Sequence, residues 1–157
     1  MEKFQITKAG FIKMKELLDN LKNIERPKII NQIAAARELG DLKENADYHS
    51  SREKQGFIEA QISDFEDKVA RAEIIDVENL SGNKVIFGAT IYLEDLNNGR
   101  KINYKIVSDF ESDIENNLIS NISPVARALL GKEVGDEVEI KVPNGEFLYE
   151  ILEIKFV

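Results

Sequence analysis

Two acidic residues three positions apart, Asp41 and Glu44, form the pattern in this sequence that points most directly to chemistry. Residues three apart on a helical turn face the same side, so the two carboxylates can share one cation. Mg²⁺ is usually held by one or two carboxylates together with water and phosphate oxygens. The same spacing also fits a capping box, with Asp41 at the N-cap and Glu44 at position N3 of a helix. The pattern therefore predicts either a magnesium ligand pair or a helix cap.

The sequence does not complete a hydrolytic site around this pair. It has neither a glycine-rich phosphate loop nor a second acidic cluster, and its one histidine, His49, is expected to be a surface or seam residue. If Asp41 and Glu44 bind Mg²⁺, a partner must supply another metal ion and the substrate, as in two-metal phosphodiester hydrolysis. We therefore expect no enzymatic activity from this chain alone, and a Mg²⁺ ion shared with the partner's active site.

Basic and aromatic residues flank the acidic pair. Arg37, Lys43 and Arg52 can contact a phosphate backbone or the 3′ end of a nucleic acid. Tyr48 can stack on a base. Two alternatives remain open at this point: the cations can form surface salt bridges with neighbouring acids, and Tyr48 can close the polar end of a helix seam.

Two helical segments must position these residues. The first carries apolar residues at helical spacing up to Leu39, and Pro27 interrupts it. We expect a kink or short break there, with Pro27 in the first turn of the helix that resumes. Gly40 then suits the left-handed position after a helix end.

The second helix is predicted from Ala46 to Ala72, a length of about 40 Å. Its apolar residues follow the alternating four-three spacing of a coiled-coil seam. These residues are Ile58, Ile62, Phe65, Val69 and Ala72. We therefore predict that residues 1–76 form an antiparallel coiled-coil hairpin whose tip carries the acidic pair.

In the second half of the chain the spacing of apolar residues changes from that of a helix to that of β-strands. Residues 85–93 form a β-rich run, and Asn97-Asn98-Gly99 indicates a hairpin turn before alternating apolar residues. Ser123, Pro124 and Gly131 are typical of the N-cap, the first turn and the C′ position of a short helix. Residues 77–157 are therefore predicted to form a small antiparallel-sheet domain with one short helix, which makes the whole chain an α+β protein.

Composition limits the classes of function. The chain has 157 residues, a net charge of −8 and no cysteine, so disulfides and thiolate metal sites are excluded. No run approaches the roughly 18 apolar residues of a membrane span. The acidic balance argues against free binding to duplex DNA or to an anionic membrane. We expect a soluble cytoplasmic protein.

Three motifs in order along the chain resemble the GreA/GreB family of bacterial transcript cleavage factors. They are GDLKENADYH at residues 40–49, flanked by Arg37 and Arg52; VIFGAT at residues 85–90; and NLISNISPVARALLGK at residues 117–132. Together they follow the family's order and extend from residue 37 to residue 132, which is far more specific than the acidic pair alone. The few basic residues near the tip favour the GreA branch of that family over the GreB branch.

The resemblance implies an N-terminal antiparallel coiled coil and a C-terminal FKBP-like domain. It implies that the coiled coil enters the secondary channel of RNA polymerase while the second domain docks on the rim, with Ser123 and Pro124 facing the polymerase. Asp41 and Glu44 match the acidic residues that help to hold the second Mg²⁺ and activate water. The polymerase then hydrolyses the 3′ segment of backtracked nascent RNA and resumes elongation. We expect the factor to be a monomer.

Three other functions compete with this interpretation. An FKBP-like half suggests a prolyl isomerase or chaperone, but such isomerases usually have a tryptophan at the floor of the pocket and this chain has none. A channel-binding inhibitor that does not cleave is disfavoured because both Asp41 and Glu44 are present. A structural coiled-coil adaptor explains the seam but not the acidic tip.

Overall fold

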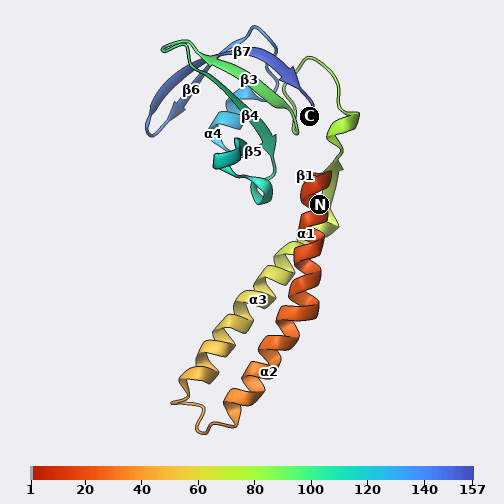
Figure 1. Ribbon diagram of the computed structural model, residues 1–157, viewed down its shortest axis with the longest axis vertical. Coiled ribbons are helices and arrows are strands. Elements are labelled where there is room, and N and C mark those ends of the chain that lie inside the picture. Colours follow the sequence, from red (N-terminus) through yellow and green to blue (C-terminus); the bar gives the residue numbers. More distant parts are fainter. Residues whose placement is uncertain (1) are drawn as a thin grey trace. The chain divides into compact units, whose positions relative to one another are not determined.

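The computed structural model describes residues 2–157 and divides them into two compact units (Figure 1). The first unit is helical and contains Phe11–Ala72 together with the residues up to Phe4. The second unit contains Gln5–Gly10 and Glu73–Val157, and a curled β-sheet makes up most of it. The predicted α+β class is confirmed.

The first helical segment runs without a break past Pro27. It consists of α1 (Lys8–Asn20), a π-helical turn η1 (Leu21–Glu25) and α2 (Arg26–Arg37). The backbone stays helical at both junctions, and the amide of Arg26 bonds to the carbonyl of Leu21, five residues earlier. Pro27 lies in the first turn of α2, as predicted. The expected break is therefore replaced by a wider helical turn, which re-pairs the backbone groups next to a residue that cannot donate a hydrogen bond.

The second helix, α3 (Ala46–Arg71), packs against the first segment in the opposite direction. Lys22 pairs with Glu66 and Arg26 pairs with Glu59, so positions later in one helix meet positions earlier in the other. The two helices share a buried cluster of Leu18, Ile29, Ile33, Ile58 and Ile62, with Leu21, Tyr48, Phe65 and Val69 packed against it. Burial of this cluster is what holds the hairpin together, at about 1.5–3 kcal/mol for each fully buried aliphatic side chain.

The second unit contains a five-stranded sheet in the order β5-β4-β3-β7-β6. Its strands are β3 (Thr90–Asp95), β4 (Lys101–Val107), β5 (Leu118–Ser120), β6 (Glu137–Val142) and β7 (Gly145–Lys155). One short helix, α4 (Pro124–Leu129), contacts β5 and β6. The remaining elements are β1 (Phe4–Thr7) and β2 (Ala72–Ile75), which form a two-stranded sheet, and the 3₁₀ turns η2 (Val77–Asn79), η3 (Asp109–Glu111) and η4 (Ile114–Asn116).

The prediction of a purely antiparallel sheet was wrong at one edge. Strands β4 and β5 pair in parallel, with Lys105 opposite Leu118 and Val107 opposite Ser120. A parallel pair needs a connection long enough to bring the chain back to the starting end of the first strand. Residues 108–117, which include η3 and η4, provide that return. The other three strand pairs are antiparallel.

The predicted strand over residues 85–93 is observed only from Thr90 onward. Val85, Phe87 and Ala89 are buried, but their backbone is a loop with a turn at Gly88, whose φ of +91° favours glycine. These side chains supplement the core of the sheet, whose central members are Ile91, Leu93, Ile106, Ile140 and Ile151. A buried apolar run has the residue types of a strand, and here the turn at Gly88 keeps the backbone of residues 85–89 in a loop.

Candidate functional site

The loop that joins α2 to α3, residues 38–45, is called the tip loop from here on. It begins with a turn in which the amides of Glu38 and Leu39 bond to carbonyls in the last turn of α2. Gly40 follows with a φ of +133°, a conformation that favours glycine. Glu38 is the C-cap, so Leu39 occupies the C′ position that was predicted for Gly40, and Gly40 lies one residue further on. Most of the loop is exposed, including Leu39 at 69% of its surface.

Asn45 caps α3, which corrects the capping-box interpretation of Asp41 and Glu44. The side-chain Oδ1 of Asn45 accepts a hydrogen bond from the amide of Tyr48 at 3.0 Å. Because the helix begins at Ala46, Asp41 and Glu44 both precede its N-cap and neither can satisfy its first amides. Their carboxylates are therefore not committed to the helix start.

The structure brings Asp41 and Glu44 to one place. Both line a shallow depression of about 320 Å³ together with Leu39, Asn45, Ala46 and Asp47. One oxygen of Asp41, Oδ1, accepts a hydrogen bond from the amide of Lys43 at 3.0 Å, and the other oxygen has no partner among the described residues. The carboxylate of Glu44 has no hydrogen bond or ion pair within residues 2–157. Three carboxylate oxygens are thus open to a ligand from outside the chain.

Arg37 and Arg52 come together on a different face of the hairpin. Both line a depression of about 220 Å³ between α2 and α3, which Ile30 and Ile33 also line. The Arg37 guanidinium lies 5.8 Å from the centre of the Tyr48 ring, and Arg52 Nη1 donates to Gln55 at 3.3 Å. Neither arginine forms a salt bridge in the described part of the chain, so the predicted alternative of local ion pairing is not observed.

Lys43 contributes its backbone to the loop and leaves its ammonium exposed. Its amide bonds to Asp41 and its carbonyl lies 3.2 Å from Nε2 of His49. The ammonium makes no ion pair within residues 2–157. Lys43 therefore presents an exposed positive charge on the same loop as the acidic pair.

Tyr48 is half-buried and packs against the hydrophobic cluster of the hairpin. Its ring also meets the edge of the His49 ring, with 5.6 Å between centres. This placement fits the prediction that Tyr48 closes the end of the seam, and it leaves less of the ring free for a base. Sequence reasoning missed the contacts of Asn45 and His49, although an asparagine directly before a helical run is a recognisable cap signal.

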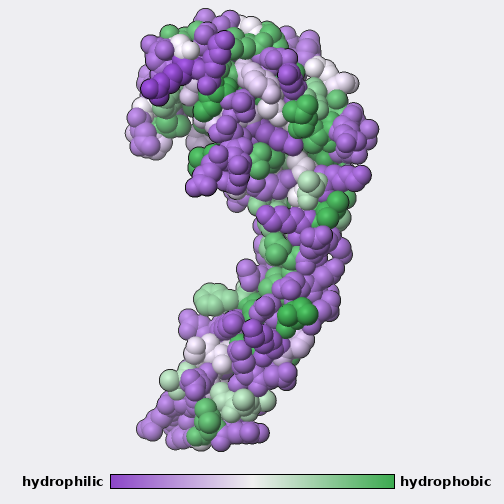
Figure 2. Space-filling model, viewed as in Figure 1, coloured by the Kyte–Doolittle hydropathy of each residue, from purple (hydrophilic) through white to green (hydrophobic). Residues whose placement is uncertain are grey.

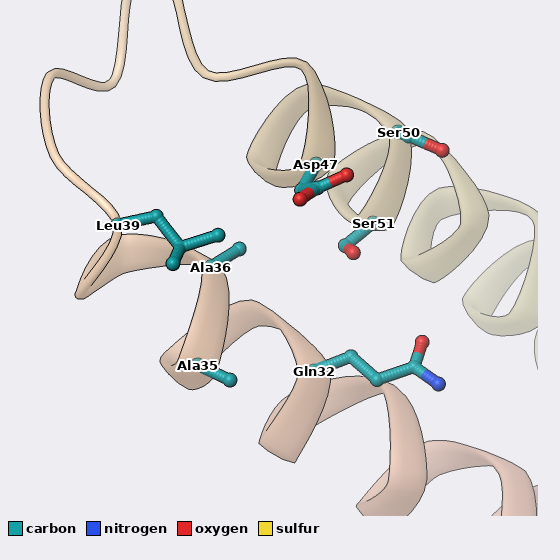
Figure 3. A pocket seen from close by; sticks show the side chains of 7 residues that line it. All are labelled: Gln32, Ala35, Ala36, Leu39, Asp47, Ser50 and Ser51. Carbon is teal, nitrogen blue, oxygen red and sulfur yellow. The ribbon is translucent and has the colours of Figure 1, made fainter.

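A third depression lies beside the tip loop, on the face drawn in Figure 3. Its volume is about 350 Å³, and α2 supplies Gln32, Ala35 and Ala36 while α3 supplies Asp47, Ser50 and Ser51. Leu39 closes the end near the loop. Figure 2 shows that the end of the hairpin is largely hydrophilic on the face drawn there, with isolated hydrophobic residues between. The end of the hairpin therefore has a mainly polar surface with small apolar patches.

Ser123 and Pro124 lie in the second unit, where they begin α4 as predicted. Ser123 is the N-cap, and its Oγ accepts a hydrogen bond from the amide of Ala126 at 3.2 Å. Pro124 is exposed in the first turn, and Gly131 follows the C-cap with a φ of +85°. The preceding Ile122 is 57% exposed, so an apolar side chain stands next to this helix start.

Within residues 2–157 no cluster of three or more acidic or histidine side chains is arranged to hold a metal ion. Two carboxylates are too few to hold Mg²⁺ tightly, so an ion at Asp41 and Glu44 would need further donors from elsewhere. Among the described residues no helix combines the length and the apolar character that crossing a membrane requires.

Comparison with known proteins identifies the family. The N-terminal model of this family of transcription elongation factors matches residues 4–74, and the C-terminal GreA/GreB model matches residues 80–156. The chain belongs to the GreA/GreB family of transcription elongation factors. It is 51% identical over its whole length to transcription elongation factor GreA of Thioalkalivibrio sulfidiphilus, and 48% identical to that of Caulobacter vibrioides, with all of each relative covered. The solved GreA factor homolog 1 of Thermus thermophilus is 26% identical over 98% of this chain and 99% of its own, with a TM-score of 0.46.

Proposed function

We propose that this protein stimulates RNA polymerase to hydrolyse the 3′ end of nascent RNA in backtracked, arrested complexes, so that elongation resumes. One observation carries the proposal: Asp41 and Glu44 line a single depression in an exposed loop at the end of a helical hairpin. Their open oxygens make no hydrogen bond or ion pair in the part of the chain that the structure describes. Membership of a family of elongation factors supports RNA polymerase as the partner.

The hairpin is the part that reaches the polymerase active site in this proposal. It acts as an antiparallel coiled coil that enters the secondary channel, and the second unit acts as an FKBP-like domain that docks at the channel rim. The exposed Pro124, together with the Ser123 cap that fixes the start of α4, supports this short helix as the docking element. The factor works as a monomer in the cytoplasm and has no catalytic activity without the polymerase.

The acidic residues fit a shared Mg²⁺ ion. Carboxylate oxygens are the donors that Mg²⁺ prefers, and two carboxylates are too few to hold it tightly without other ligands. Asp41 offers the oxygen that Lys43 does not use, and Glu44 offers both of its oxygens. In phosphodiester hydrolysis a bound Mg²⁺ supplies an activated water. Asp41 and Glu44 would hold the ion beside the polymerase site and orient that water.

The basic residues have a separate role toward the RNA. Arg37 and Arg52 lie over one groove and are free of ion pairs in the described chain, so their guanidinium groups are available to phosphates. Lys43 presents a further positive charge on the acidic loop itself. Tyr48 contributes by holding Arg37 over its ring, and any base contact uses the part of the ring left exposed.

Replacing Asp41 with asparagine tests the proposal. Asparagine keeps an Oδ1 that can accept the Lys43 amide, so the loop is retained while the charge on the metal ligand is lost. We expect Asp41→Asn to abolish stimulated cleavage of RNA in stalled elongation complexes without lowering the melting temperature. Glu38→Gln is the matched control, because Glu38 is an exposed acid of the same loop outside the depression.

Full cleavage by Asp41→Asn would refute the role of the acidic pair. Binding to polymerase without any cleavage by the unmodified protein would instead identify a channel-blocking inhibitor. Rapid turnover of a proline-containing peptide by the isolated protein would favour the isomerase alternative.

A further inference from the structure

Asn45 holds the two ends of the tip loop together. Its Nδ2 donates to the carbonyl of Ala36 in the last turn of α2 at 2.5 Å, while its Oδ1 accepts from Tyr48 at the start of α3 at 3.0 Å. One half-buried side chain thus caps one helix and adds a hydrogen bond to a terminal carbonyl of the other. The loop is closed at its base by these two bonds.

His49 holds the middle of the same loop. Its Nε2 lies 3.2 Å from the carbonyl oxygen of Lys43, and a carbonyl oxygen only accepts, so this nitrogen carries the hydrogen. The amide of Lys43 in turn donates to Oδ1 of Asp41 at 3.0 Å. Lys43 therefore connects the imidazole of His49 to the carboxylate of Asp41 through its own backbone. The ring of His49 is itself set against the ring of Tyr48.

Packing does little to order the tip loop. Every residue from Glu38 to Glu44 is exposed, and its two leucines, Leu39 and Leu42, are 69% and 41% exposed. A segment with few buried apolar contacts opens easily unless specific bonds hold it. Two side-chain bonds supply that hold: Asn45 ties the end of the loop to Ala36 in α2, and His49 in α3 reaches the carbonyl of Lys43 within the loop.

We propose that Asn45 and His49 are positioning residues that fix the tip loop so that Asp41 and Glu44 face one shared ligand. This inference rests on the proposed function, because the ligand pair matters only if the tip acts in cleavage. Neither residue contacts RNA or metal in this role. A misplacement of about 1 Å in a reacting group can lower a rate by about a hundredfold. We call the Asn45–Ala36 and His49–Lys43 hydrogen bonds the two clamps of the loop. Loss of either clamp is expected to lower the cleavage rate and to leave binding of the factor to polymerase unchanged.

Two substitutions separate positioning from folding. Asn45→Asp keeps the oxygen that caps α3 and loses the donor to Ala36. His49→Phe keeps a ring against Tyr48 and loses the donor to Lys43. Ser50→Ala is the control, because Ser50 adjoins His49 on α3 and makes no hydrogen bond through its side chain in the described chain.

The experiment measures the maximal rate of RNA cleavage in backtracked polymerase complexes, the factor concentration that gives half of it, and amide hydrogen exchange of Lys43 in the free protein. We expect Asn45→Asp and His49→Phe to lower the maximal rate by about tenfold or more, to leave the half-saturating concentration unchanged, and to speed exchange. His49→Gln, which retains a side-chain donor, should recover part of the rate.

Unchanged rates and unchanged exchange in both variants would overturn the inference, as would a rate loss matched by the same loss of polymerase binding. If the unmodified protein stimulates no cleavage, the proposed function fails. In that case faster exchange in both variants still supports the clamp, and unchanged exchange overturns it.

Discussion

Arg26 and Glu59 are joined by two parallel hydrogen bonds, Nε to Oε1 at 2.7 Å and Nη2 to Oε2 at 2.8 Å. The pair connects the first residue of α2, directly after the π-helical turn, to the middle of α3. This bidentate geometry gives directional specificity that a single contact lacks. The hydrogen bond from Arg26 lowers the pKa of the Glu59 carboxyl below its ordinary value of 4.5, and the same bond raises the pKa of Arg26. The pair therefore fixes where α2 meets α3 after the irregular turn.

The lowered pKa of Glu59 predicts a pH-dependent contribution to stability. A carboxyl with a depressed pKa stabilises the fold fully above its unfolded pKa, and this stabilisation is lost as the pH falls through the folded pKa. Glu59→Gln should therefore reduce the free energy of unfolding at neutral pH, and the difference should vanish in acid. The effect is expected to be small, because both side chains are substantially exposed.

Urea unfolding of the two proteins across a pH series measures this difference. Glu53→Gln on the same helix is the control, since Glu53 is exposed and has no ion pair in the described chain. A stability difference for Glu59→Gln that persists in acid would show that the ion pair is not its source.

Two helical glycines are predicted to respond in opposite ways to alanine. A Cβ at Gly10 in α1 would collide with the Glu111 carboxyl, whereas a Cβ at Gly56 in α3 meets nothing within 4 Å. Glu111 cannot move aside freely, because it accepts hydrogen bonds from Thr7 and Ser108. We expect Gly10→Ala to lower the free energy of unfolding by about 1–3 kcal/mol and Gly56→Ala to raise it by about 0.5–1 kcal/mol.

Thermal and urea unfolding of a double-mutant cycle with Glu111→Ala locates the cause of the Gly10 effect. In the Glu111→Ala background the collision is absent, so Gly10→Ala should show the gain expected of a helical alanine. An equal loss in both backgrounds would place the strain elsewhere. The single variant Glu111→Ala measures how far the hydrogen bonds of Glu111 to Thr7 and Ser108 together stabilise the second unit.

Periodic burial is the part of the fold that could be predicted from the sequence. Ile58 and Ile62 are buried at the predicted seam, because apolar spacing alone determines which face of a helix is removed from water. The start of α3 at Ala46 and the cap of α4 by Ser123 also follow from local chemistry. In the tip the sequence identified Asp41 and Glu44 as neighbours, and the structure places both on one depression.

Competing local preferences explain what could not be predicted. Asp41 and Asn45 both have side chains that can cap a helix start, and only the contact from Asn45 to the Tyr48 amide shows that Asn45 does so. The hydrogen bond from Asn45 to Ala36 depends on α2 and α3 lying side by side. The spacing of residues along the chain does not determine this tertiary arrangement. The parallel pairing of β4 with β5 likewise depends on the path of residues 108–117 and not on the pattern within either strand.

Arg52 provides a test of the phosphate role that is independent of the acidic pair. Its guanidinium lies over the groove it shares with Arg37, whereas Lys54, two residues along α3, does not line that groove and lies about 200° around the helix. A residue that contacts one phosphate of single-stranded RNA contributes about 0.7 to the slope of log affinity against log salt. Arg52→Gln should raise the factor concentration needed for half-maximal cleavage. It should also reduce the slope of the logarithm of that concentration against the logarithm of the potassium chloride concentration by about 0.7. Lys54→Gln removes the same charge from the same helix and should change neither quantity. Equal effects of the two substitutions would mean that net charge of the hairpin, rather than a phosphate contact in this groove, attracts the complex.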